Sequence, residues 1–172
     1  MGVSTFQTAL DHGIRPGFSI DNEVSYGTDM FTEMRVAFYV QRAMATYRKS
    51  NGDAKAPALV AVRPVLESAT LGGAACAGLL DTCGSLTPGK AADLVLIRTD
   101  DLNLYPSNHA VGTVVLAADT RNIDTVIIGG KVRKLRGKMI GVNMERFRQL
   151  ADESRAYLFM RAGYKLDVFS KG

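Results

Sequence analysis

The sequence predicts an α/β fold in which a helix-rich first part is followed by an antiparallel sheet and a C-terminal helix. Two helical patterns flank a short β-type run before about residue 50, which is typical of an α/β layer. Beyond about residue 90, short strands are joined by tight turns, as in antiparallel sheets. The 172 residues are 47% hydrophobic and 22% charged, so a buried core is expected. We therefore divide the chain into 1–90, 91–142 and 143–172.

Two helices are predicted in the first 50 residues. Ser4 and Gln7 have the spacing of a capping box, and Gly13 stands where a left-handed residue ends a helix, so residues 5–12 form the first one. The second extends over residues 30–48, where six side chains recur at helical spacing and form a stripe along one face. This stripe consists of Met30, Met34, Ala37, Phe38, Gln41 and Ala45.

Small residues dominate the next helical stretch. Residues 62–68 are predicted to form a helix, and Thr70 to cap a second one over residues 71–80. The second helix is rich in glycine and alanine, and glycine is a poor helix former. We therefore expect close packing against a neighbouring element to compensate. A turn is predicted at residues 87–90.

The sheet and the last helix complete the predicted elements. Strands are expected at residues 92–97, 111–117, 123–128 and 131–135, and Gly129-Gly130 forms a two-residue hairpin turn between the last two. Asn143 is predicted to cap a helix that continues through residue 161. Its inward-facing side chains are expected to be Met144, Phe147, Leu150, Ala151, Ser154, Tyr157 and Leu158.

Composition excludes several classes of protein. The net charge of +4 is mild, and its one dense basic run, residues 131–138, is expected to be a solvated hairpin face, so no nucleic-acid partner is predicted. No apolar run reaches the ~18 residues that a membrane span needs, and the first residues lack the charged-then-apolar pattern of a signal peptide, so neither is expected. We expect a cytoplasmic protein. Cys76 and Cys83 are predicted to be reduced, buried side chains, because no further Cys or His pattern indicates a zinc site.

Asp21 is the most informative carboxylate. It directly follows the β-type run of residues 14–20, and α/β barrels carry reactive groups at this end of their strands. A carboxylate there could bind a metal or take a proton from water, although a loop or cap role is the simpler interpretation. Asp29 is a rival that N-capping explains, while His12 suits a helix C-terminus and His109 a surface loop. Two histidines and one aspartate do not supply the three or four ligands of a metal hydrolase.

Three stretches together resemble one enzyme family. Residues 18–21 with 30–35 resemble the final barrel strand and helix of metal-dependent amidohydrolases. The small-residue stretch from Ala69 and the Gly-Ser-Leu-Thr-Pro-Gly-Lys segment of residues 84–90 are similar to the most recognisable C-terminal motif of that family. Residues 126–132 resemble its closing hairpin. The branch that the sequence resembles includes cytosine deaminase, guanine deaminase and triazine chlorohydrolase.

The resemblance carries definite expectations. It implies the last strand and helices of a (β/α)8 barrel over residues 1–90, antiparallel strands of a small β-sandwich over 91–142, and a C-terminal helix. It implies that Asp21 is both a metal ligand and the catalytic proton acceptor, in a parent enzyme that uses zinc or iron to deaminate or dechlorinate a small heterocycle. The His-x-His pair of such enzymes is absent from this sequence. We therefore expect the C-terminal portion of a longer enzyme, inactive alone and without a tightly bound metal, that self-associates as a homo-oligomer. The alternative is a non-catalytic module that binds itself or a partner.

Overall fold

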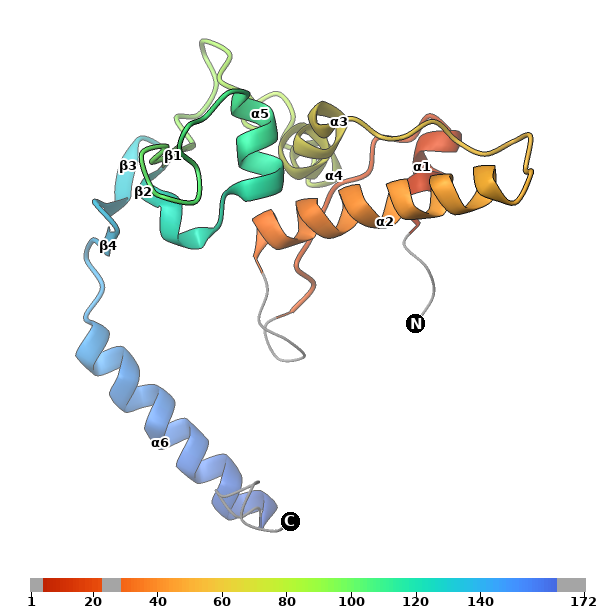
Figure 1. Cartoon of the computed structure of the whole chain (residues 1–172). Coiled ribbons are helices and arrows are strands. Elements are labelled where there is room, and N and C mark those ends of the chain that lie inside the picture. The colour runs from red at the N-terminus through yellow and green to blue at the C-terminus, as the bar shows by residue number, and fades with distance from the viewer. Residues whose placement is uncertain (1–4, 23–28, 164–172) are drawn as a thin grey trace. The chain divides into compact units, whose positions relative to one another are not determined.

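The computed structural model describes residues 5–22 and 29–163 (Figure 1). The chain divides into two compact units, Met1–Lys138 and Met139–Gly172, and each is described by itself. The sequence-based division at residues 90 and 142 concerns family domains and stays a prediction. Among the described residues, no helix is long and apolar enough to cross a membrane.

The longest helix of the first unit begins at a well-formed cap. Helix α2 spans Met30–Ser50, and the Asp29 carboxylate accepts hydrogen bonds from the backbone N–H groups of Phe31 (2.9 Å) and Thr32 (3.1 Å). The short helix α1 spans Phe6–Asp11, and Gly13 follows it at φ +68°, which confirms the predicted left-handed stop. Ser4, of the predicted capping box, lies outside the described residues.

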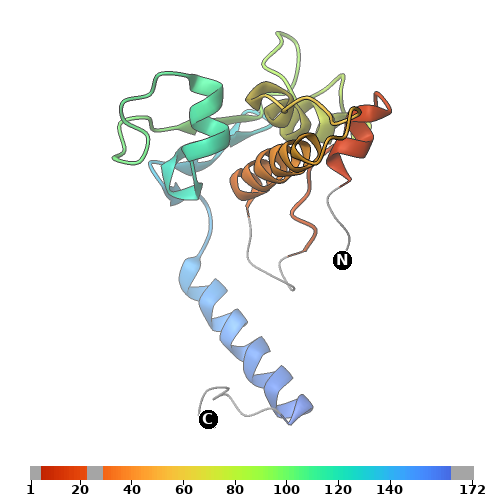
Figure 2. The same ribbon diagram turned by 45° about the vertical axis from the view of Figure 1, so that its right-hand side comes forward.

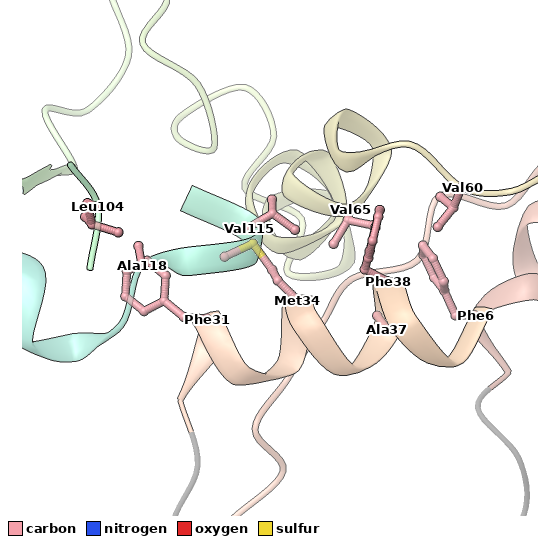
Figure 3. Packing of buried hydrophobic residues seen from close by; sticks show 10 residues of the cluster. All are labelled: Phe6, Phe31, Met34, Ala37, Phe38, Val60, Val65, Leu104, Val115 and Ala118. Atoms are coloured by element: carbon pink, nitrogen blue, oxygen red, sulfur yellow. The ribbon is translucent and has the colours of Figure 1, made fainter. Parts of the chain in front are cut away.

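The hydrophobic core of this unit lies along one face of α2. Met34, Ala37 and Phe38 are buried there, and they meet side chains from α1, from the segment before α3 and from residues 104–118 (Figure 3). Of the predicted stripe, every member except the partly buried Met30 is buried. The apolar face of α2 is therefore the surface on which the other elements of the unit pack.

A continuous helical segment follows where two separate helices were predicted. Helix α3 (Val62–Glu67) passes directly into a π-helical turn, η1 (Ser68–Gly72), and then into the short helix α4 (Gly73–Cys76). The prediction that Thr70 starts a new helix is wrong. Its hydroxyl donates to the carbonyl oxygen of Leu66 (2.8 Å), which is how a threonine inside a helix satisfies its side chain. The helix also ends earlier than predicted, with Gly78 at φ +70°.

The predicted strand over residues 14–20 is not formed. The segment is extended, but the described part of the chain contains no strand paired with it. Its backbone is held by a helix instead, because the N–H of Phe18 donates to the carbonyl oxygen of Ser68 (3.3 Å). A β-type run becomes a strand only when a neighbouring strand completes the hydrogen-bond ladder, and Pro16 removes one of the donors.

The antiparallel sheet agrees with the prediction in three strands. Its order is β1 (Leu94–Ile97), β2 (Ile123–Ile128), β3 (Lys131–Leu135) and β4 (Lys138–Met139). Gly129 and Gly130 connect β2 to β3 at φ +54° and +75°, as the predicted two-residue turn requires. The basic run on β3 is largely exposed, which confirms it as a solvated face.

The predicted strand over residues 111–117 is a helix. Helix α5 (Ala110–Gly112) continues into the π-helical turn η2 (Thr113–Ala117), and both views show this segment beside α2 and α3 (Figures 1 and 2). The valine-rich sequence favours a strand, but Val115 is completely buried in the core that α2 organises. Packing against two helices therefore overrides local β propensity.

The second unit consists mainly of helix α6, Met144–Ala162. Asn143 caps it as predicted, because its side-chain oxygen accepts the N–H of Arg146 (2.9 Å), and Gly163 follows at φ +67°. The predicted inward face is not buried: Phe147 is 58% exposed and Leu158 is 61% exposed. Burial of such a face needs an opposing element, and this unit contains no second helix among its described residues.

Candidate functional site

Asp21 lies at the end of the extended segment in an unusual backbone conformation. Its φ of +61° is in the left-handed region, which few residues other than glycine adopt. The N–H of Asp21 donates to the hydroxyl oxygen of Ser19 (3.0 Å), and the side-chain amide of Asn22 donates to the Asp21 carboxylate (3.1 Å). The side chain is exposed. Asp21 is therefore an oriented carboxylate on the surface of the described chain.

A close contact between two glycines anchors the segment that leads to Asp21. A Cβ atom at Gly72 would lie 2.2 Å from the carbonyl oxygen of Pro16, and one at Gly17 would lie 3.0 Å from the sulfur of Cys76. Only glycine lets η1 approach the backbone of residues 16–17 so closely. This confirms the predicted close packing at Gly72, whereas a Cβ at Gly73 or Gly78 would meet nothing within 4 Å.

Asp29, the alternative candidate carboxylate, caps the N-terminus of α2. Besides the two backbone donors, it accepts the hydroxyl of Thr32 (2.8 Å), so both of its oxygens are bonded within the first turn of α2. Asp29 is therefore a structural cap, as predicted. Gly27 and Thr28, the other residues of that Gly-Thr-Asp sequence, lie outside the described residues.

The described residues do not fit a catalytic metal by themselves. No group of three or more His, Cys, Asp or Glu side chains gathers anywhere in residues 5–22 and 29–163. His109 is an exposed loop residue, as predicted, and it also caps α5 by accepting the N–H of Gly112 at Nδ1 (2.8 Å). His12 ends α1, in agreement with its predicted role at a helix C-terminus. Asp21 alone falls short of the three protein ligands of a catalytic zinc site.

The two cysteines offer no metal site either. Both are free thiols, and Cys83 is half-buried. Cys76 is exposed, so the prediction that both cysteines are buried is wrong for Cys76, and Cys83 meets it only in part. The helix turns the Cys76 side chain toward Gly17 at the edge of the packed segment rather than into the core.

The Gly-Ser-Leu-Thr-Pro-Gly-Lys segment and the residues after it are structural. The Lys90 ammonium donates to the carbonyl oxygens of Leu80 and of Cys83 (3.1 Å in the second case), which closes the loop between them. The Asp93 carboxylate accepts the N–H of Gly129 (2.6 Å), and so ties the start of β1 to the turn between β2 and β3. The charged side chains of Lys90 and Asp93 therefore form hydrogen bonds with backbone groups of this chain, which is a structural role and not a ligand-binding one.

A buried polar cluster that the sequence analysis missed lies beside the sheet. Asn122 is 2% exposed, and its side chain bonds Asp101 (2.8 Å), Asn103 (3.0 and 3.1 Å) and the backbone N–H of Asp119 (2.9 Å). The amide of Asn122 and then the guanidinium of Arg98 hold the pKa of Asp101 below its usual value. The signal that could have found this cluster is Asp119 followed by Asn122 at the spacing of a capping box, which the structure shows to be formed.

Hydrogen bonds from Arg121 lower the pKa of Asp119 to about 2. The guanidinium of Arg121 is the larger cause of the lowered pKa, and the backbone N–H of Arg121 (2.8 Å) lowers it further. These bonds close the turn η3 (Thr120–Asn122) that leads into β2. The cluster therefore serves the sheet and is not a candidate catalytic centre.

The sequence of this chain matches a known family over most of its length. Residues 2–133 match the family described as "Amidohydrolase family". The chain belongs to the amidohydrolase family. This agrees with the resemblance found in the motifs, and the α/β structure with its small antiparallel sheet fits the fold of that family.

Relatives within the amidohydrolase family include deaminases. The chain is 34% identical over 140 residues to a 5-methylthioadenosine/S-adenosylhomocysteine deaminase from Desulforudis audaxviator, a match that covers 81% of this chain and 30% of the relative. It is 32% identical over 145 residues to the corresponding deaminase of Moorella thermoacetica, which covers 84% and 32%. This amidohydrolase chain therefore spans about a third of the length of these relatives.

Solved structures of the family are similar in fold. An adenosine deaminase from Xanthomonas campestris with bound zinc gives a TM-score of 0.76 at 27% identity, covering 90% of this chain and 34% of that one. A mutant of the atrazine chlorohydrolase of Arthrobacter aurescens, complexed with zinc and atraton, gives 0.74 at 22% identity, covering 88% and 32%. The second likeness shows the fold alone.

Proposed function

We propose that this amidohydrolase chain is the C-terminal part of a metal-dependent enzyme that deaminates or dechlorinates a small heterocycle. In this proposal, residues 1–90 contribute the last strand and helices of a (β/α)8 barrel, and residues 91–142 contribute strands of a small β-sandwich. The support is family membership over residues 2–133 together with a match to only about a third of each relative. The extended segment of residues 14–20, which lacks a paired strand among the described residues, is the barrel strand of this proposal.

Asp21 is the residue that this chain contributes to the reaction. It is an exposed carboxylate at the end of the extended segment, and bonds from Asn22 and to Ser19 orient it. A carboxylate in this place is suited to hold a metal and to accept a proton. The remaining ligands come from the rest of the parent enzyme, since the described residues hold no group of three. Zinc or iron would supply the activated water, and the chain alone is expected to be inactive.

The substrate class follows from the relatives. Proteins named as methylthioadenosine/S-adenosylhomocysteine deaminases are similar to this chain at 32–34% identity. A purine nucleoside that carries an exocyclic amine is therefore the first substrate to assay, and a chlorinated triazine is the second.

A chimera tests the proposal directly. This chain replaces the matched third of the Desulforudis audaxviator deaminase, and deamination of 5-methylthioadenosine is measured. We expect Asp21→Asn to lower kcat by about 100-fold or more, because a general base is lost. The matched control Asp29→Asn keeps a capping side chain and should leave activity unchanged. Equal activity in the two variants would refute the role of Asp21.

The isolated chain provides the second test. Equilibrium dialysis against zinc should give no stoichiometric binding, and 5-methylthioadenosine should not be turned over. Stoichiometric zinc that disappears in Asp21→Asn, together with deaminase activity, would contradict the proposal that the site is completed by another part of the enzyme.

A self-associating module is the second candidate. The observation in its favour is the apolar face of α6, on which Phe147, Tyr157 and Leu158 are each more than half exposed. Apolar faces of this kind are normally covered in solution, so a homo-oligomer is expected. A monomer in sedimentation experiments at micromolar concentration would rule this candidate out.

A further inference from the structure

Ser19 is the side chain that accepts the backbone N–H of Asp21. Its hydroxyl oxygen lies 3.0 Å from that nitrogen, across a two-residue separation. Asp21 is one of two non-glycine residues with a positive φ among those described, at +61°. A left-handed conformation is unfavourable for a residue with a Cβ, so it needs an interaction that selects it.

The side chain of Asp21 is not buried in the core. The segment bonds the helical layer at Phe18, whose N–H donates to the carbonyl oxygen of Ser68 three residues before Asp21. Ser19, Asp21 and Asn22 are exposed, and Ile20 between them is partly buried. The short-range hydrogen bonds with Ser19 and Asn22 act directly on Asp21.

The two bonds act on different parts of Asp21. Ser19 engages the backbone, and the φ of Asp21 sets the direction in which its side chain leaves the chain. Asn22 engages the carboxylate itself, by donating from its side-chain amide to Oδ2 (3.1 Å). Loss of the first bond allows the whole residue to rotate, whereas loss of the second changes one contact of the carboxylate.

We propose that Ser19 is a positioning residue that holds Asp21 in the left-handed conformation from which its carboxylate acts. This inference rests on the proposed function for its catalytic consequence, but the conformational part stands on this chain alone. Ser19 does not touch the reacting atoms in this scheme. It determines the geometry of the residue that does, and small errors in that geometry are costly in rate.

The conformation is measured by NMR on the 172-residue chain. A residue with positive φ gives a strong intraresidue NOE between its amide and Hα protons. We expect this NOE for Asp21 in the parent sequence, a clear weakening in Ser19→Ala, and recovery in Ser19→Thr, which restores the hydroxyl. The control Ser107→Ala removes another exposed hydroxyl, bonded to Thr113 (3.0 Å), and should leave Asp21 unchanged. An undiminished NOE in Ser19→Ala, or none in the parent, overturns the proposal.

Kinetics of the chimera supply the second readout. Ser19→Ala should lower kcat by about 10- to 100-fold with little change in KM, and Ser19→Thr should restore it. If Asp21→Asn abolishes activity while Ser19→Ala leaves kcat intact, Ser19 has no positioning role. If Asp21→Asn is fully active, the proposed function fails, and the NOE then decides whether Ser19 holds Asp21. A chimera that does not fold leaves that decision with the NOE as well.

Discussion

Because Gly72 contacts Pro16, alanine substitutions at Gly72 and at the adjacent Gly73 should change the free energy of unfolding in opposite directions. A Cβ at Gly72 would lie 2.2 Å from the Pro16 carbonyl oxygen and 3.1 Å from its carbon, whereas a Cβ at Gly73 meets nothing within 4 Å. Both residues are helical, so alanine favours the folded state by up to about 1 kcal/mol at either position. The obstacle at Gly72 is backbone, which cannot rotate away as a side chain can.

The magnitude follows from that geometry. Ordinary contact requires the extended segment to move by about 1 Å, and such overpacking costs about 1–3 kcal/mol. We therefore expect Gly72→Ala to lower the free energy of unfolding by about 1–2 kcal/mol after the helix gain, and Gly73→Ala to raise it by up to about 1 kcal/mol. Urea unfolding followed by circular dichroism measures both, with an unchanged m-value as the check. Equal effects of the two substitutions would show that the glycine contact does not exist in solution.

Two further predictions concern the buried polar cluster. Asn122→Ala leaves several groups around a 2%-exposed site without their partner, and should lower the free energy of unfolding by about 2–4 kcal/mol in urea titration. The exposed Asn51→Ala, which loses one bond to Tyr47 (2.8 Å), should cost under about 1 kcal/mol, and similar costs would contradict this account. Because the folded-state pKa of Asp119 is lowered to about 2, its stabilising contribution is present above about pH 4 and is lost as the pH falls toward 2. Asp119→Asn should therefore show a smaller decrease in stability across this window than the parent chain, and an identical decrease would refute the assignment.

Local signals predicted the elements that depend on local interactions. The caps at Asp29 and Asn143 and the Gly129-Gly130 turn satisfy backbone groups a few residues away, so they can be recognised in the sequence. The small-residue motif predicted close packing for the same reason: lack of a Cβ is visible in the sequence, although the partner at Pro16 is not.

The role of Asp21 stays a prediction. It was inferred from the place of Asp21 after a β-type run and from the family resemblance, and the chain does belong to that family. The left-handed backbone of Asp21 and the bond to Ser19 were not predicted, because serine and aspartate adopt many other conformations in loops.

Long-range packing accounts for the predictions that were wrong. Residues 111–117 have the composition of a strand, yet they form α5 and η2 because Val115 is buried against helices from distant parts of the chain. Residues 14–20 have the pattern of a strand, but strand formation requires a partner strand, and in the described chain a helix carbonyl takes that place. A residue's hydrogen-bonding capacity and shape can be read directly from the chain. Which of its possible partners it meets is a property of the folded arrangement, since contacts between distant segments contribute more free energy than the local preference they override.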